Sequence, residues 1–138
     1  MKQILKQIFL YIIGGLIYLL IEILFRGHTH WTMFIVGGLC FTLIGLLNEY
    51  PNFRLSLIYQ GILGSIIITA LEFISGVVIN IILKWNVWDY SNQPLNLLGQ
   101  ICLPFSLAWV FLAIIAVFVD DILRYIIFKE EIPKYKIL

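Results

Sequence analysis

The sequence predicts an all-α, polytopic membrane protein built as a four-helix transmembrane bundle. Hydrophobic residues make up 62% of the 138-residue chain and charged residues only 12%, whereas a soluble domain carries about 25% charged residues. A chain this apolar cannot cover itself with a polar surface, so lipid must form part of its solvent. We therefore expect one integral membrane domain over residues 1–138 that is embedded in the lipid bilayer as its partner.

The four predicted helices correspond to long apolar runs. They cover about residues 4–25, 31–47, 55–83 and 95–119, and a helix needs roughly 20 apolar residues to cross the hydrocarbon core. Continuous runs without strict alternation are typical of helices and not of barrel strands. Pro104 lies within the fourth run, where we expect it to kink the helix or to break its first turns.

The distribution of lysine and arginine predicts that both termini face the cytoplasm. With the N-terminus inside, the outer segments carry only Arg26 and Lys84. The cytoplasmic segments carry Lys2, Lys6, Arg54, Arg124, Lys129, Lys134 and Lys136. This bias follows the positive-inside rule and predicts a multi-pass protein of the cytoplasmic membrane with a fixed orientation.

This topology also predicts where the C-terminal tail and three of the tryptophans lie relative to the membrane. Residues 120–138 form a predicted cytoplasmic amphipathic tail, and its stretch 122–128 is expected to continue the fourth helix along the interface. Trp31, Trp85 and Trp88 fall at the outer interface, where amphipathic indoles are favoured. We predict that these three residues anchor the protein at that interface.

Two pairs of segments resemble each other within the chain. GGLIYLLIE (residues 14–22) and GSIIITALE (residues 64–72) place a small pair at the same distance before a glutamate. GGLC (residues 37–40) and GQIC (residues 99–102) form the second pair. One interpretation is a parallel repeat of two helical hairpins. The other is chance similarity among glycines in apolar sequence.

Each predicted helix carries its small and polar residues on one face. On the first three spans these residues are Tyr11, Gly15, Tyr18, Glu22 and Arg26; Gly38, Thr42, Gly45 and Glu49; and Gly61, Ser65, Thr69, Glu72, Gly76 and Asn80. Small residues let membrane helices approach closely, and hydroxyl groups bond across the interface. The seam of the bundle explains most of this pattern, but it explains the carboxyl groups less well.

Two glutamates lie within predicted spans. Glu22 and Arg26 are four residues apart with the acid first, which favours an ion pair along the helix. Glu72 lies near the middle of its span, where a charge costs at least a few kcal/mol. It is either protonated and bonded to a backbone carbonyl or Asn80, or paired across the bundle. The cross-bundle candidates are Arg26, His28, His30 and Lys84.

The remaining motifs exclude several classes of chemistry. Cys40 and Cys102 lie in apolar runs without a CxxC pattern, so we expect two unpaired, buried thiols and no zinc. His28 and His30 could act as a metal pair, as a general base or as plain interfacial residues, and we predict no metal site. The chain has no nucleotide-binding glycine-rich loop and no hydrolase motif, so no cofactor is expected and an enzyme is the less favoured class. No basic run indicates nucleic acid.

The predicted topology gathers polar residues on the outer side. Asn96 and Gln100 are expected to open the fourth helix at that level. The full convergent set is Glu22, Arg26, His28, His30, Glu72, Asn80, Asp89, Tyr90, Asn96 and Gln100. It predicts an outward-facing polar pocket, with plain decoration of the interface as the alternative.

Three stretches carry a resemblance to a known family. RGHTHWTMFIVGGLCFTLIGLLNE, LEFISGVVIN and WNVWDYSNQPLNLLGQICLPFSLAW resemble the small integral-membrane proteins described as putative ABC-transporter type IV, or CmpB-like. The resemblance covers about residues 10–125. It implies a multi-pass bacterial membrane protein that is a component of a transporter, with any ATPase subunit supplied by another chain.

Three functions remain open from the sequence. The first is a transport component that works as a homo-oligomer or with a partner subunit. The second is a membrane-embedded enzyme acting on a lipid or lipid-linked substrate, with His28 or His30 as base, Asp89 or Glu22 orienting it and Arg26 holding an anionic headgroup. The third is an assembly protein that docks through WNVWDYS.

Overall fold

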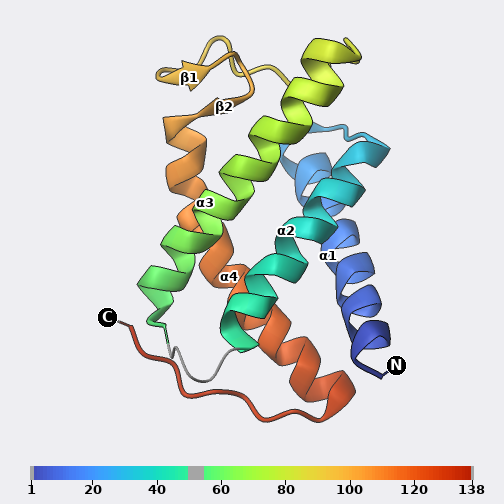
Figure 1. Ribbon diagram of the computed structural model, residues 1–138, viewed down its shortest axis with the longest axis vertical. Helices are drawn as coiled ribbons and strands as arrows, with labels where there is room; N and C mark the ends of the chain where they lie inside the picture. The colour runs from blue at the N-terminus through green and yellow to red at the C-terminus, as the bar shows by residue number, and fades with distance from the viewer. Residues whose placement is uncertain (1, 50–54, 138) are drawn as a thin grey trace.

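The computed structural model describes residues 2–49 and 55–137 and shows an all-α bundle (Figure 1). Its helices are α1 (Lys2–Arg26), α2 (Trp31–Glu49), α3 (Leu57–Gly76) and α4 (Leu103–Phe128). α1 packs chiefly against α2, and α3 chiefly against α4, while α2 also contacts α3 and α4. The predicted fold class, an all-α four-helix bundle, is confirmed.

The helices have the length and composition of membrane spans. Within the described residues, three are long and apolar enough to cross a bilayer: Lys2–Arg26, Leu57–Ile82 and Leu103–Phe128. The apolar part of α2, Trp31–Leu47, is shorter. The protein is therefore a membrane protein, and its shortest helix is the one that packs against all three others.

α3 begins at a defined cap and ends in an irregular turn. The Ser56 side chain accepts a hydrogen bond from the Tyr59 amide at 3.2 Å, which satisfies one free N–H of the first turn. At its other end α3 passes into the π-helix η1 (Val77–Ile82). π-helical turns are rare and are frequent at functional sites. Here the wider turn contains the buried side chain of Asn80.

The start of α4 differs from the prediction. α4 begins at Leu103, not near residue 95, with Pro104 in its first turn, where a missing N–H has no cost. The preceding residues form a small antiparallel hairpin of β1 (Asn96–Leu97) and β2 (Ile101–Cys102). The expectation that Asn96 and Gln100 open the fourth helix was therefore wrong. The apolar composition is helix-like, but Gly99 turns the chain with a φ of 72°.

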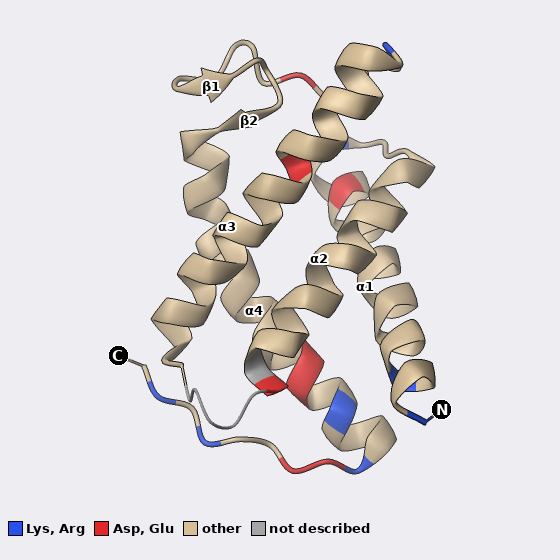
Figure 2. Cartoon of the chain, viewed as in Figure 1, with Lys and Arg blue, Asp and Glu red and all other residues tan. Residues whose placement is uncertain are grey.

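Both termini lie at the same end of the bundle, which we call the terminal end (Figure 1). The connection 27–30 and the segment 83–102 lie at the opposite end, the loop end. α4 continues to Phe128, as predicted for its last turns. The chain then returns to α3, where the Leu57 amide donates to the Lys136 carbonyl at 2.6 Å. Charged residues concentrate at the terminal end (Figure 2).

The internal repeat is only partly reflected in the fold. The first pair of segments lies in α1 and α3, so Glu22 and Glu72 occupy comparable helices. The second pair does not match, because residues 37–40 are helical and residues 99–102 belong to the hairpin. The similarity of GGLC and GQIC therefore does not reflect a common structure.

Glycines set the closest helix contacts. A Cβ atom added at Gly64 would lie 2.5 Å from the Ala113 Cβ, between α3 and α4. Ala113 is fully buried in the main core cluster, with Ile44, Ile68 and Val117. Cys40 and Cys102 are free and buried, as predicted.

Replacing Gly64 with valine should force α3 and α4 apart. Overpacking of this kind costs about 1–3 kcal/mol, and we expect a lower midpoint of thermal unfolding in detergent. Ala70→Val, on the exposed face of α3, is the matched control. Equal unfolding midpoints for the two variants would show that the Gly64 contact does not limit the packing.

Candidate functional site

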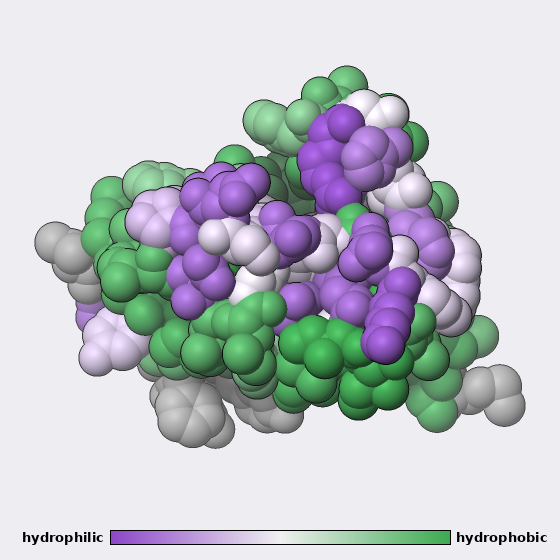
Figure 3. Space-filling model, turned by 90° about the horizontal axis from the view of Figure 1, so that it is seen from above, coloured by the Kyte–Doolittle hydropathy of each residue, from purple (hydrophilic) through white to green (hydrophobic). Residues whose placement is uncertain are grey.

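The candidate site is a cavity of about 570 Å³ at the loop end. We call it the loop-side cavity. It is lined by Tyr18, Ile21, Glu22, Phe25, Arg26, Trp88, Asp89, Tyr90, Phe105, Ala108, Trp109, Phe111, Leu112 and Ile115. α1, α4 and the segment 83–102 therefore form its walls, and most of the lining is aromatic or aliphatic. Hydrophilic side chains gather across this end of the molecule, bordered by hydrophobic ones (Figure 3).

Glu22 and Arg26 form the ion pair that their spacing predicts. The Arg26 Nη1 lies 3.0 Å from the Glu22 Oε2, and Glu22 is buried. The Arg26 Nη2 donates to the Val87 carbonyl at 2.6 Å. Arg26 thus ties the end of α1 to the segment 83–102, and two of its donor groups are occupied.

Glu72 is 3% exposed and has two aromatic partners. The Tyr90 hydroxyl donates to its Oε2 at 3.1 Å, and the Trp109 indole N–H donates to its Oε1. The contacts expected from the sequence, with a cation of another segment or with Asn80, were therefore wrong. Trp109 was missed altogether. Its signal was an indole N–H in the middle of an apolar run, where a donor needs an acceptor within the protein.

Asn80 and Gln100 hold the segment 83–102 against the bundle. The Asn80 Nδ2 donates to the Gln100 Oε1 at 2.8 Å, and the Val87 amide donates to the Asn80 Oδ1 at 2.8 Å. The Trp88 indole N–H donates to the Gln100 carbonyl at 3.0 Å. All these groups are buried. We call Asn80, Gln100, Val87 and Trp88 the loop lock.

Only part of the predicted tryptophan anchor faces outward. Trp31 is 61% exposed and Trp85 is 47% exposed, whereas Trp88 is 7% exposed. Trp88 therefore differs from the prediction, because its indole N–H bonds to a buried carbonyl instead of facing the interface. Trp31 and Trp85 stay a predicted interface anchor.

Asn96 and Asp89 bond within the loop. The Asn96 Nδ2 donates to the Gln93 carbonyl at 2.9 Å, and its Oδ1 accepts from the Gly99 amide at 3.1 Å. Asp89 is exposed and accepts from both the hydroxyl and the amide of Ser91. These bonds lower the pKa of Asp89 below its ordinary value, so the carboxylate stays ionised at neutral pH.

The histidines lie apart from the cavity. The His30 Nδ1 lies 2.8 Å from the Thr32 Oγ1, and its ring lies near Trp31 and Trp85, with centroids 5.5 and 5.8 Å away. His28 is exposed. Neither residue is among those that line the loop-side cavity.

The predicted polar set thus divides into four groups. Glu22, Arg26, Asp89 and Tyr90 line the cavity; Glu72 lies behind its Tyr90 and Trp109 wall; Asn80, Asn96 and Gln100 fix the loop; and His28 and His30 stand apart. Within residues 2–49 and 55–137, no three His, Cys, Asp or Glu side chains lie so that they could hold a metal ion.

Asn80→Ala should loosen the loop lock. The buried Val87 amide would lose its acceptor, at about 1–3 kcal/mol, and the segment 83–102 should become more sensitive to limited proteolysis. Trp88 fluorescence should also shift towards longer wavelengths as its ring becomes hydrated. Asn92→Ala, in an exposed turn of the same segment, is the control. Unchanged proteolysis of the Asn80 variant would refute the role of the lock.

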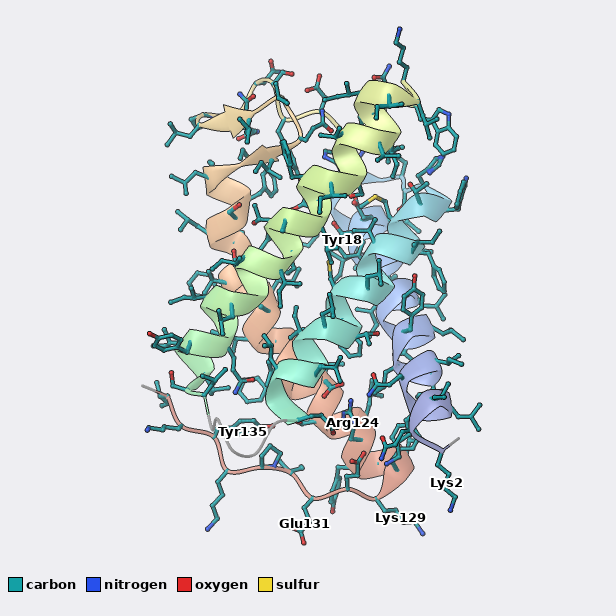
Figure 4. The ribbon with its side chains drawn as sticks, viewed as in Figure 1. Lys2, Tyr18, Arg124, Lys129, Glu131 and Tyr135 are labelled. Atoms are coloured by element: carbon teal, nitrogen blue, oxygen red, sulfur yellow. The ribbon has the colours of Figure 1, made fainter. Side chains whose placement is uncertain are left out.

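A second polar cluster lies at the terminal end. Arg124 is 4% exposed, and its Nε donates to the Asp120 Oδ2 at 2.9 Å while its Nη1 lies 2.6 Å from the Glu49 Oε1. Glu130 lies 3.8 Å from the same Nη1. We call these four residues the terminal-end cluster; Figure 4 labels Arg124 at this end of the bundle. The sequence pattern placed Glu49 on the polar face of the second span, but it treated Arg124 only as an orientation charge.

The tail packs beside this cluster. The Tyr135 hydroxyl donates to the Asp121 Oδ2 at 2.7 Å, and its ring contacts Phe118 edge to face at 4.7 Å. Burial and the bond to Asp121 raise the pKa of Tyr135 above its ordinary value, so its hydroxyl stays protonated as a donor.

Comparisons with known proteins identify the family. Searches of curated proteins and of solved structures gave no match. The family model described as "Putative ABC-transporter type IV" matches residues 5–135, which includes α2, α3, α4, the segment 83–102 and all of α1 except its first three residues. The chain therefore belongs to the putative ABC-transporter type IV family.

Proposed function

We propose that the chain is a component of a membrane transport assembly and that the loop-side cavity is its binding site. The family supports a transporter role. We place the protein in the bacterial inner membrane with the terminal end in the cytoplasm and the cavity facing outward. Support comes from the described basic residues: Arg26 and Lys84 belong to the loop end, and Lys2, Lys6, Arg124, Lys129, Lys134 and Lys136 to the terminal end. Arg54 of the predicted count lies outside the described residues.

The buried carboxyl groups carry the proposal. Glu22 and Glu72 lie within membrane-spanning helices and are 7% and 3% exposed. A bundle seam needs only small and apolar side chains, and a charged residue within a span costs at least a few kcal/mol. Glu22 lines the loop-side cavity, and Glu72 bonds two residues of its wall. Acidic groups gathered at one cavity are typical of a substrate or ion site.

The fold also supports partners. Four helices with a cavity at one end do not by themselves enclose a path through the bilayer, and the sequence carries no nucleotide-binding motif. The outer face of α1 is apolar and exposed at Ile12, Leu16 and Leu20. We propose that this chain works as a homo-oligomer or with a partner membrane or ATPase subunit.

The mass of the intact assembly tests the proposal. The protein is extracted in native lipid particles without detergent and weighed by native mass spectrometry. We expect a mass that exceeds one chain, either as multiples of this chain or with a copurifying subunit. A strict monomer without any copurifying subunit would contradict a transport assembly.

A lipid-processing enzyme receives no support from the contacts. That function needs His28 or His30 oriented by Asp89 or Glu22. His30 bonds Thr32, Glu22 bonds Arg26 and Asp89 bonds Ser91. The three candidate groups are thus engaged separately, and the catalytic pair that this function requires is not assembled.

A further inference from the structure

We infer that the loop-side cavity binds a hydrophobic organic cation, such as a quaternary ammonium or phosphonium compound. This inference rests on the proposed function and names the class of its ligand. The cavity of about 570 Å³ falls within the roughly 300–1,000 Å³ that small-molecule sites occupy. Its walls combine the two features that such a cation requires, aromatic rings and uncompensated negative charge.

The aromatic rings form the first feature. Tyr18, Trp88, Tyr90, Phe105 and Trp109 all line the cavity. Tyr90 stacks on Phe105 at 5.0 Å between centroids, and Phe105 lies 5.8 Å from Trp109, so three of the rings form one continuous wall. The negative faces of aromatic rings attract cations, and aromatic cages bind quaternary ammonium groups in this way.

The charges form the second feature. Arg26 is paired with Glu22, so these two lining residues balance each other. Asp89 bonds only to Ser91 among the described contacts, and Glu72 bonds to Tyr90 and Trp109. These partners are neutral donors. Among the charged residues that line the cavity, Asp89 is thus a carboxylate without a cationic partner in the described contacts. The lining therefore has an excess of negative charge that an anionic ligand would meet unfavourably.

Glu72 also acts on the rings themselves. Both side chains that donate to it, Tyr90 and Trp109, belong to the cavity wall. A ring whose polar hydrogen is bonded to an acceptor oxygen gains electron density, which strengthens its attraction for a cation. Glu72 thus lies one layer behind the ligand and is a positioning residue that tunes the wall.

The geometry also provides a path from the bilayer. At the terminal end α1 and α4 meet, with Phe9 and Phe128 at 5.8 Å between ring centroids and Lys6 3.5 Å from Glu130. Towards the loop end the two helices separate (Figure 1). Phe25 and Phe111, which line the cavity from these helices, are 85% and 71% exposed. A hydrophobic cation dissolved in the membrane can therefore reach the cavity from the side.

Two probes of the same shape and opposite charge test the inference. The protein in zwitterionic lipid nanodiscs is titrated with tetraphenylphosphonium and, separately, with tetraphenylborate, and binding is measured by equilibrium dialysis against empty nanodiscs. We expect saturable binding of the phosphonium with an affinity at least about tenfold above that of the borate. Equal or stronger binding of the borate would overturn the inference and would favour an anionic headgroup at Arg26.

Variants locate the binding. Glu72→Gln and Phe105→Leu should each weaken phosphonium binding by about fivefold or more, and Glu131→Gln, an exposed residue of the tail, should leave it unchanged. Thermal unfolding shows that each variant is folded; if Glu72→Gln is not, Phe105→Leu and Asp89→Asn carry the test. Unchanged binding in folded cavity variants would overturn the inference. The mass of the intact assembly is measured independently. If that mass exceeds one chain but the phosphonium does not bind, the proposed function stands and only the ligand class is wrong.

Discussion

Replacing Arg124 with alanine is expected to destabilise the protein more than any other single change. Arg124 bonds Asp120, which is 1% exposed, and its loss would leave that carboxylate buried without a counter-charge. Breaking a buried pair from one side costs about 3–5 kcal/mol. We expect a strong fall in the amount of folded protein in the membrane and in the midpoint of thermal unfolding.

Three further variants separate charge from packing at the terminal-end cluster. Lys134→Ala, in the exposed tail, is the control and should have no effect. Arg124→Lys should recover part of the stability, because it keeps the charge but loses the planar fork. Adding Asp120→Asn to Arg124→Ala should also restore part of it, since position 120 then no longer carries a buried charge without a counter-charge. If Arg124→Ala unfolds at the same temperature as Lys134→Ala, the cluster does not stabilise the bundle.

The second large effect is expected at Glu72. In Glu72→Leu the Tyr90 hydroxyl and the Trp109 indole N–H would lose their acceptor, and each orphaned buried donor costs about 1–3 kcal/mol. Glu72→Gln keeps an amide oxygen and should be milder. The near-ultraviolet circular dichroism of Trp109 and the thermal midpoint report both changes.

Ser75→Ala provides the comparison on the same helix, because Ser75 bonds, within the part of the chain that the structure describes, only to backbone carbonyls of α3. Leucine at position 72 should destabilise the protein clearly more than alanine at position 75. If instead Glu72→Leu were as stable as the unsubstituted protein, the Glu72 side chain would not hold Tyr90 and Trp109 in place. Other contacts would then fix these two rings in the cavity wall.

Contacts within one helix could be predicted from the sequence. The Glu22–Arg26 pair follows from the helical period alone, since residues four apart are neighbours on any helix. The apolar runs likewise predict α1, α2 and most of α3, because a span must satisfy its backbone groups internally. These features depend on local geometry that every helix shares.

Contacts between segments could not be predicted in the same way. The bond between Trp109 and Glu72 depends on the rotation and depth of α4 against α3, which the helical period does not determine. The hairpin at residues 96–102 was not predicted, because its leucines and isoleucine are typical of the start of a membrane span. The partner of Asp120 was missed because Arg124 was weighed as a surface charge, although its side chain is buried.

The central claim is that the loop-side cavity is a binding site that faces the outside of the cell. A cysteine at Ala108, which lines the cavity, tests it with a membrane-impermeant thiol reagent on intact cells. The unsubstituted protein, whose two cysteines are buried, gives the background. Cysteine at Lys134 in the tail is the opposite control.

We expect the Ala108→Cys variant to be labelled in intact cells, and tetraphenylphosphonium to slow that labelling. The Lys134→Cys variant should be labelled only after the membrane is permeabilised. Labelling of Lys134→Cys in intact cells, or an Ala108→Cys variant that is folded but inert to the reagent on both sides, would contradict an outward-facing cavity.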